Sequence, residues 1–394
     1  MRILFVAIPH SIHSARWIDQ LADQNHEVHL FPAMGTKPHE SLKNVRLHCT
    51  NIGFRIISRL VDLYKKRAIA KSRSLPKLFD TLLDRSFWLS RIIRRVKPDI
   101  IHSLEIQHAG YLTLAARERN KGKFPKWIMT NWGSDIFLFG RLASHVEKIR
   151  KILALCDYYS CECQRDVKLA RDFGLKGEVL PILPNGGGFD LQRIARLRQS
   201  GATSSRRLIL LKGYQGWVGR ALVGLRALEL CSDVLRGYKV AVYLARGDVA
   251  IAAELISKSA GIPIELIPPC SHERMLSLFG RARVYIGLSI SDAISTSLLE
   301  AIIMGAFPIQ SSTSCADEWI ESGKTGLIVP PEDPEIIAKA IRLAVSDDSL
   351  VDSAAKINAR LAAERLDHST IRPQVVAMYE KVAAQRPAKS KERR

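Results

Sequence analysis

Residues 290–305 decide the fold of this chain and read Ile-Ser-Asp-Ala-Ile-Ser-Thr-Ser-Leu-Leu-Glu-Ala-Ile-Ile-Met-Gly. The run before them, Val284–Ser289, is apolar and partly β-branched, which is typical of a buried parallel strand. Leu298–Met304 carry apolar residues at helical spacing, and the glycine that follows them suits the end of a helix. We therefore expect a strand, a turn that contains Asp292, and a helix that carries Glu300 near its start.

A helix that begins beyond the carboxyl end of a parallel strand is a common place for a ligand in an open α/β sheet. Its first turn offers backbone N–H groups and the positive end of the helix dipole, and both favour a phosphate. The small hydroxyl residues Ser295, Thr296 and Ser297 lie at this point of the sequence. Asp292 and Glu300 flank them, and their carboxylates can accept hydrogen bonds from sugar hydroxyls.

A purely structural interpretation of the same spacing stays open. Ser297 and Glu300 fit the Ser-x-x-Glu capping box, in which Glu300 only starts the helix. Asp292 is then an ordinary turn residue. Spacing alone favours neither interpretation, because short motifs often match by chance.

The acid-x7-Glu spacing of Asp292 and Glu300 resembles a motif of the retaining GT-B glycosyltransferases, specifically of the GT4 family. Glu300–Ser312 is similar to that family's Glu-Ala-small-Gly-x-Pro-Val-Val pattern, and Asp317–Pro330 also resembles the family. Asp292 replaces the usual first Glu with a shorter acid of the same charge. The resemblance covers most of the chain and is strongest over residues 280–335.

The resemblance implies an α/β fold of the GT-B class, with two Rossmann-like domains that face a central cleft. We expect an N-terminal acceptor domain at residues 1–198 and a C-terminal nucleotide-sugar donor domain at residues 206–368. Residues 199–205 between them are small and polar, as in a linker. We expect residues 369–385 to form a helix that crosses back to the N-terminal domain, and residues 386–394 to be a disordered basic tail.

A glycine-rich segment, Gly213–Arg220, follows the first strand of the second domain and permits close backbone approach to a ligand. The family pattern here is Gly-Arg, five residues and Lys, and both cations hold the donor diphosphate. Tyr214 occupies the Arg position and Arg220 the Lys position. One cation is therefore lost, or another residue such as Lys212 supplies it. The structural alternative for Arg220 is a solvated residue at a helix start.

Candidate acceptor contacts lie in two loops of the first domain. His10 and His13 follow the strand expected at residues 2–8, in a loop without the Gly-x-Gly-x-x-Gly fingerprint of dinucleotide binding. Trp132 and Asp135 stand where the family has His-Gly-x-Asp. Trp132 cannot act as an acid or base, but it can stack on a sugar or donate its indole N–H.

The resemblance implies a metal-independent, retaining hexosyltransferase that needs no cofactor. Glu300 would hold the ribose hydroxyls, Asp292 would position the transferred sugar, and Arg220 would neutralise the diphosphate, so these three are the expected catalytic residues. The resemblance places the nucleobase beside the segment around Cys270. The expected donor-binding residues are Gly213, Tyr214, Arg220, Ser295, Thr296, Ser297, Glu300 and Cys270, and no metal ligand is expected.

The net charge of +20 calls for an anionic partner, and residues 54–97 hold 13 Lys and Arg against three Asp. Apolar residues recur there at helical spacing, so we expect contact with an anionic membrane surface, with Phe87 and Trp88 at the boundary. The alternative is a pair of surface helices that pack on the sheet. Nucleic-acid binding is not expected, because no recognised motif accompanies the charge.

No apolar run is long enough to span a bilayer, and the apolar N-terminus stops at Pro9, which favours a buried strand over a signal peptide. The seven cysteines are scattered and odd in number, which supports neither a zinc site nor a disulfide framework. We therefore expect a cytoplasmic protein, peripheral on the inner face of the plasma membrane.

The basic first domain suggests that the acceptor is a bacterial surface glycan or a lipid-linked saccharide, and hence a role in polysaccharide biosynthesis. The alternative function is a non-catalytic GT-B-fold binding subunit of a glycan assembly complex. The departures from the family pattern at Tyr214 and Trp132 motivate this alternative.

Overall fold

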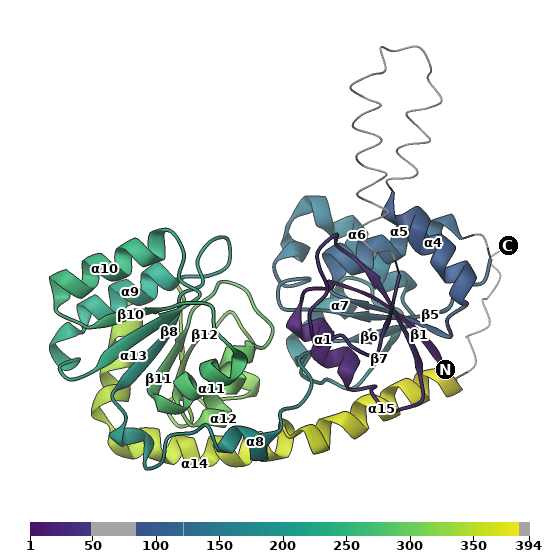
Figure 1. The fold of residues 1–394 in the computed structure, drawn as a ribbon. Helices are drawn as coiled ribbons and strands as arrows, with labels where there is room; N and C mark the ends of the chain where they lie inside the picture. The colour runs from purple at the N-terminus through teal and green to yellow at the C-terminus, as the bar shows by residue number, and fades with distance from the viewer. Residues whose placement is uncertain (49–83, 121, 386–394) are drawn as a thin grey trace. The chain divides into compact units, whose positions relative to one another are not determined.

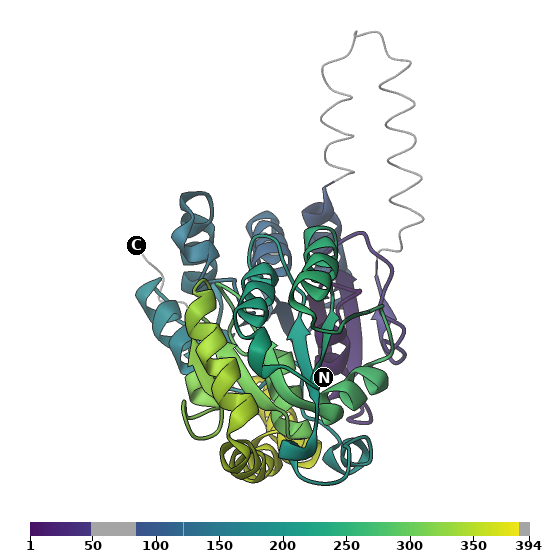
Figure 2. The ribbon, with the colours of Figure 1, turned by 90° about the vertical axis from the view of Figure 1, so that its left-hand side faces the viewer.

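The computed structural model describes residues 1–48, 84–120 and 122–385. The chain forms two compact units, Met1–Gly187 with Arg372–Arg394, and Gly188–Ile371. Each unit contains one parallel sheet with helices on both faces, as Figures 1 and 2 show. The predicted α/β class is therefore confirmed.

The sheet of the first unit has the strand order β3-β2-β1-β4-β5-β6-β7. Its central strands are continuous apolar runs, because a parallel sheet is covered on both faces. All its neighbouring strands are parallel, and Phe5 on β1 pairs with Leu30 on β2 and with His102 on β4. The strands are β1 (Arg2–Ala7), β2 (Glu27–Pro32), β3 (Arg46–Leu47), β4 (Ile100–Leu104), β5 (Lys126–Thr130), β6 (Tyr158–Ser160) and β7 (Glu178–Val179).

Successive residues of β1 face different helical layers of this unit. Leu4 and Val6 join a core cluster with apolar residues of α4, α5 and α6, whereas Phe5 packs edge-on against Tyr379 of α15. The described helices are α1 (Ile12–Asp19), α4 (Arg85–Val96), the π-helix η1 (Ile106–Gly110), α5 (Tyr111–Arg119), η2 (Phe139–Arg141), α6 (Ala143–Leu155), α7 (Gln164–Asp172) and the greater part of α15 (His368–Ala384).

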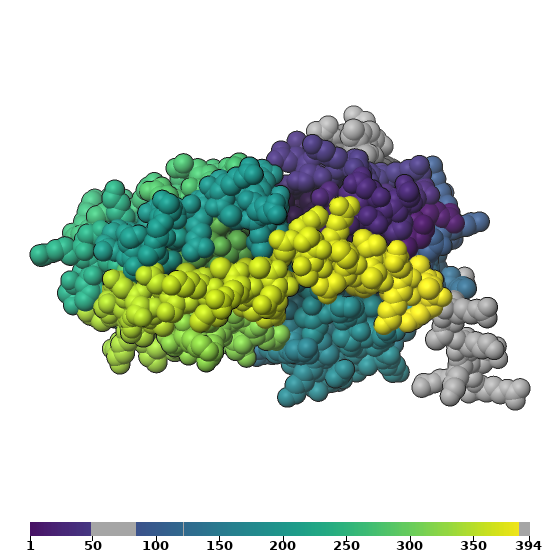
Figure 3. All heavy atoms as spheres, turned by 90° about the horizontal axis from the view of Figure 1, so that it is seen from below, coloured from purple at the N-terminus to yellow at the C-terminus, as the bar shows by residue number. Residues whose placement is uncertain are grey.

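A buried hydrogen-bond network attaches α15 to this unit. The Tyr379 hydroxyl accepts from Trp17 Nε1 at 2.9 Å and lies 2.5 Å from His102 Nδ1. His102 Nε2 lies 2.5 Å from Thr130 Oγ1. One side of α15, yellow in Figure 3, is visible at the surface, whereas Val375, Met378 and Val382 are buried. Residues of α1, β4, β5 and the C-terminal helix thus share one polar cluster inside the core.

The sheet of the second unit has the order β10-β9-β8-β11-β12-β13, and every neighbouring pair is parallel. The strand predicted at Val284–Ser289 is β11, which begins and ends two residues earlier. The strands are β8 (Leu208–Lys212), β9 (Lys239–Tyr243), β10 (Ile264–Ile267), β11 (Ala282–Gly287), β12 (Phe307–Ser311) and β13 (Leu327–Val329).

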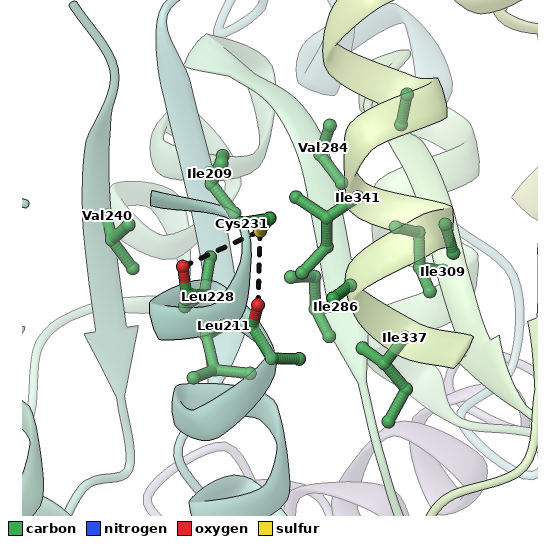
Figure 4. Close-up of a cluster of buried hydrophobic side chains, with 14 of the residues drawn as sticks. Ile209, Leu211, Leu228, Cys231, Val240, Val284, Ile286, Ile309, Ile337 and Ile341 are labelled. Carbon is green, nitrogen blue, oxygen red and sulfur yellow. Dashed lines mark hydrogen bonds between the residues drawn. The ribbon is translucent and has the colours of Figure 1, made fainter. Parts of the chain in front are cut away.

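Figure 4 shows part of the core of this unit, where side chains of β8, β9, β11 and β12 meet Leu228, Ile337 and Ile341. Cys231 ends α9 inside this cluster, and its thiol donates to the carbonyl oxygens of Ala227 and Leu228. The helices of the unit are α8 (Leu191–Ala195), η3 (Thr203–Ser205), α9 (Ala221–Leu230), η4 (Ser232–Val234), α10 (Asp248–Ala260), α11 (His272–Arg281), α12 (Thr296–Met304), η5 (Ala316–Glu318), α13 (Pro334–Ser346) and α14 (Asp348–Arg365).

The division between the units differs from the expected domain limits. Residues 188–198 pack with the second unit, because Phe189 N donates to Leu366 O at 2.8 Å and Ile194 is buried. The expected linker also lies within that unit, where Thr203 Oγ1 donates to Gly305 O at 2.7 Å. At the other end the division falls inside α15, between Ile371 and Arg372.

Some predictions fall partly or wholly outside the described residues. Of the basic segment 54–97, residues 54–83 are not described, and neither is the expected tail at 386–394. In the described part of the chain, none of the six cysteines forms a disulfide, and none of the helices has the length and apolarity that a bilayer span requires.

Candidate functional site

The strand order of the second unit reverses at its two central strands. From β8 the chain continues to β9 and β10 on one side, whereas β11, β12 and β13 lie on the other. Ligands of open α/β sheets bind at such a reversal, beyond the carboxyl ends of the strands. The loop that leaves β8 is the glycine-rich segment Gly213–Arg220, and the loop that leaves β11, residues 288–295, contains the start of the stretch 290–305.

These two loops are hydrogen-bonded to each other. Arg220 N donates to Leu288 O at 3.1 Å, and Ile290 N donates to Val218 O at 2.9 Å. Segments about 70 residues apart in sequence thus form one surface at the sheet edge.

The glycines of the first loop serve the packing of the chain itself. A Cβ on Gly213 would lie 2.7 Å from Tyr243 O, and one on Gly219 would lie 2.0 Å from Tyr214 O. Gly216 has a φ of +118°, a conformation that side chains rarely adopt. The predicted close approach to a ligand remains a prediction, whereas close approach within the chain is observed.

The N-terminus of α12 lies beside a cation. Ser295 is the N-cap, and its side chain makes no capping hydrogen bond to the helix. Instead its hydroxyl accepts from the ammonium of Lys212, at the end of β8, with an Nζ–Oγ distance of 3.5 Å. The positive end of the helix dipole and a lysine charge therefore meet at Ser295, Thr296 and Ser297, an arrangement that favours an anion.

Asp292 lies in the turn between β11 and α12, where the sequence placed it. Its Oδ1 accepts from the backbone N–H of Ala293 at 3.0 Å, and its side chain is half-buried. The carbonyl of Ala293 in turn accepts from Cys315 N at 2.8 Å, which fixes the turn against the loop after β12.

Glu300 lies one turn into α12 and does not form the capping box. Its carboxylate is buried, and Oε1 lies 2.7 Å from Nε2 of His272. The Ser297 hydroxyl accepts from Tyr243 at 2.8 Å. The capping-box alternative is wrong, because the N-cap is Ser295, two residues before Ser297, and the Glu300 side chain bonds to His272 of α11 instead.

Arg220 is held by an acidic partner. Its Nε donates to Glu332 Oε1 at 2.9 Å and its Nη1 to Gly219 O at 2.9 Å. The Arg220 side chain is 20% exposed, so it is not a solvated helix-start residue. Of the other predicted donor contacts, Tyr214 is 39% exposed and Cys270 is half-buried just before α11.

In the first unit the structure brings His13 and Trp132 together. Their rings contact edge to face, with centroids 5.9 Å apart, and a Cβ on Gly186 would lie 3.7 Å from His13 Nδ1. These residues follow β1, β5 and β7, all at the carboxyl edge of the sheet. His10 is separate from this pair, because its Nδ1 is bonded to Thr36 Oγ1 at 2.7 Å.

The Asp135 carboxylate is buried and accepts hydrogen bonds from backbone N–H groups. Its Oδ2 accepts from the N–H groups of Trp132 and Ile106, each at 2.8 Å. Burial raises the pKa of this carboxyl well above its usual range, and the neighbouring Glu105 raises it further. Asp135 therefore holds the Trp132 loop to η1, and its contact with an acceptor remains a prediction.

Sequence reasoning missed three residues that shape these sites. His272 and Tyr243 come from other elements of the second unit and reach α12 only in the folded chain. Glu105, with a φ of +84°, accepts from the N–H groups of Gln107 and His108 and starts η1. The one available signal was the position of His272, which lies two residues after Cys270 in the segment expected beside the nucleobase.

Comparisons with known proteins agree with this picture. Residues 2–155 match a family model described as glycosyl transferase 4-like, and residues 253–361 match one described as glycosyl transferases group 1. The matches fall in different units and support a GT4-like glycosyltransferase family. A comparison with curated proteins gives no match.

Three similar solved structures span nearly the whole chain. The sucrose-phosphate synthase of Thermosynechococcus elongatus has a TM-score of 0.69 at 14% identity, covering 98% of this chain and 100% of that one. Anabaena HepE, solved with UDP and glucose, has the same TM-score, identity and coverage. The trehalose 6-phosphate synthase of Burkholderia multivorans has a TM-score of 0.69 at 13% identity, covering 98% of this chain and 99% of that one. These likenesses confirm the predicted GT-B fold.

Proposed function

We propose that this protein is a retaining glycosyltransferase whose second unit binds a nucleotide-diphosphate sugar. The observation that carries the proposal is the meeting of Lys212, the α12 N-terminus and the Glu300 carboxylate at the edge of one sheet. A cation and a helix dipole suit a diphosphate, and a carboxylate suits the hydroxyls of a ribose. HepE was solved with UDP and with UDP-glucose, which is consistent with such a donor here.

The diphosphate would lie across the first turn of α12, with Lys212 beside it. Arg220 could join when phosphate replaces Glu332, because an ion pair with a 66% exposed glutamate contributes little. These charges would stabilise the departing diphosphate as negative charge develops, which is the largest contribution to many enzymatic rates.

In the proposed reaction the bond between the anomeric carbon and the diphosphate oxygen breaks. A bond to the acceptor hydroxyl oxygen forms on the same face of the sugar, which retains its configuration. The departing phosphate oxygen takes the proton of that hydroxyl, so no carboxylate has to act as a dedicated base. Asp292, held by the Ala293 N–H, would position the transferred sugar.

The acceptor would bind to the first unit. The edge-to-face pair of His13 and Trp132 offers an aromatic surface for a sugar ring at the carboxyl edge of that sheet. We propose a saccharide or lipid-linked acceptor, as in the assembly of a surface glycan.

We also propose peripheral contact with an anionic membrane through α4. Arg91, Arg94 and Arg95 are exposed on this helix, and the Arg91 guanidinium lies 5.8 Å from the centre of the Phe87 ring. Basic residues next to an aromatic ring suit an anionic lipid surface.

A second candidate is a non-catalytic subunit that binds nucleotide sugars or glycans. The observations that favour it are the neutral Tyr214 in the position of a cation, the ion pair that occupies Arg220, and Trp132 in place of a histidine. It predicts ligand binding without turnover.

The test is sugar release or transfer from a panel of nucleotide sugars, with Glu300→Ala and Lys212→Met beside the unchanged protein. We expect turnover with one donor and a loss of at least about tenfold in each variant, since a hydrogen bond to a charged group contributes about 1.5–3 kcal/mol. Binding without turnover would favour the second candidate. Unchanged turnover in both variants would remove the proposed site.

A further inference from the structure

The hydrogen bond between His272 and Glu300 joins the first residue of α11 to the second turn of α12. Ser271 caps α11 by accepting from Arg274 N at 3.3 Å, and this cap fixes the place of His272 at the helix start. Helices α11 and α12 pack against each other on one face of the sheet. The backbone positions of both partners are therefore set by the fold.

The chemistry of the pair fixes the direction of the hydrogen bond. An ionised carboxylate can only accept, so His272 donates its Nε2–H to Oε1 over 2.7 Å. The Glu300 side chain is 9% exposed and that of His272 is 42% exposed. Within the described part of the chain, the other oxygen of Glu300, Oε2, has no hydrogen bond. One side of the carboxylate is thus occupied and the other is available to a ligand.

We propose that His272 is a positioning residue for ribose recognition, which rests on the proposed function of the site. His272 holds one carboxylate oxygen so that the other faces the 2′- and 3′-hydroxyls of the donor. Fixing a glutamate side chain in one position costs rotamer entropy. Because the hydrogen bond from His272 fixes the Glu300 side chain before the donor binds, donor binding does not have to supply that entropy cost.

The competing interpretation is that His272 only compensates a buried charge and so stabilises the fold. The two interpretations differ in what the ligand experiences. A loss of fold stability weakens every ligand of the unit in the same way. A loss of carboxylate position weakens only ligands that carry ribose hydroxyls.

The experiment compares UDP, ADP and GDP with their 2′,3′-dideoxy forms by calorimetric titration. For the tightest-binding base, the ratio of the two dissociation constants measures recognition of the hydroxyls. Glu300→Ala gives the ratio without the carboxylate. We expect His272→Ala to reduce the ratio by about five- to tenfold, as for a lost hydrogen bond to a charged group. His272→Gln keeps an N–H donor and should restore most of it.

Glu273→Gln is the matched control, because Glu273 is the next residue of α11 and is exposed. It should leave the ratio unchanged. An unchanged ratio in His272→Ala, where Glu300→Ala does reduce it, would overturn the inference and leave the proposed function standing. Equal weakening of both ligand forms by His272→Ala would do the same. If no nucleoside diphosphate binds, or Glu300→Ala leaves the ratio unchanged, the proposed role of Glu300 fails and this inference fails with it.

Discussion

Replacing His102 by Gln should destabilise the first unit strongly at neutral pH and less at acidic pH. The imidazole is completely buried, and burial lowers its pKa to about 3. It is therefore neutral in the folded protein. Trp17 donates to the Tyr379 oxygen, and the buried Tyr379 O–H itself needs an acceptor. The arrangement that satisfies every group has this O–H donate to Nδ1 of His102, and the Nε2–H donate to Thr130 Oγ1.

The magnitude follows from the difference between the folded and unfolded pKa values. The unfolded histidine titrates near 6.5, as in model peptides, so between pH 6.5 and pH 3 only the unfolded state binds this proton. The contribution of His102 to stability is complete above pH 6.5 and falls as the pH decreases toward 3. At pH 5.0 the loss is about 2 kcal/mol, from about 1.5 pH units at about 1.4 kcal/mol each.

Urea unfolding at pH 8.0 and pH 5.0 tests this prediction. Tryptophan fluorescence reports mainly on the first unit, which holds four of the six tryptophans, namely Trp17, Trp88, Trp127 and Trp132. The measured quantity is the difference in free energy of unfolding between the unsubstituted protein and His102→Gln, in which groups that titrate alike in both proteins cancel. This difference should be about 2 kcal/mol smaller at pH 5.0 than at pH 8.0. Equal differences at the two pH values would refute the argument that the folded protein excludes this proton.

Three further predictions concern single contacts. Tyr379→Phe should cost about 2–4 kcal/mol in urea unfolding, because it leaves two buried partners unsatisfied; a cost like that of Tyr238→Phe, which removes one 3.3 Å hydrogen bond, would contradict this. Lys212→Met should weaken UDP binding about tenfold and leave uridine binding unchanged in calorimetry. Adding Tyr214→Arg should restore part of the loss, and equal weakening of both ligands would exclude a phosphate contact. Gly219→Ala should lower the melting temperature of the second unit by several degrees, because the new Cβ would lie 2.0 Å from a carbonyl oxygen; an unchanged melting temperature would contradict that crowding.

The sequence predicts the framework of the second unit because its signals are local. Apolar runs mark the strands, and Gly305 ends α12 with a φ of +74°, as the pattern indicated. Asp292 and Glu300 occupy the turn and the helix expected for them. Their spacing could not decide between a capping box and a ligand site, because that depends on where the helix begins.

What the sequence could not show are the partners that folding brings from far away. His272 lies 28 residues before Glu300, and Glu332 lies 112 residues after Arg220. No periodicity links such positions, since they meet through the packing of α11 on α12 and through the loop after β13. The packing of residues 199–205 on the second unit also depends on a distant partner, since Thr203 Oγ1 donates to Gly305 O. Small polar residues predict an irregular segment, but not which unit it packs on.

Because Arg220 is paired with Glu332, the two cations of the proposed donor site would contact a diphosphate one after the other. The sequence analysis predicts that Arg220 neutralises the diphosphate. It names Lys212 as a possible source of the second positive charge, because Tyr214 stands where the family has Arg. In the folded chain the ammonium of Lys212 already lies beside the N-cap of α12, whereas the guanidinium is bound to Glu332. A phosphate would therefore meet Lys212 and the helix dipole first. Arg220 would follow only by exchanging a solvent-exposed carboxylate for the ligand, which makes the second cation a consequence of binding and not a precondition for it.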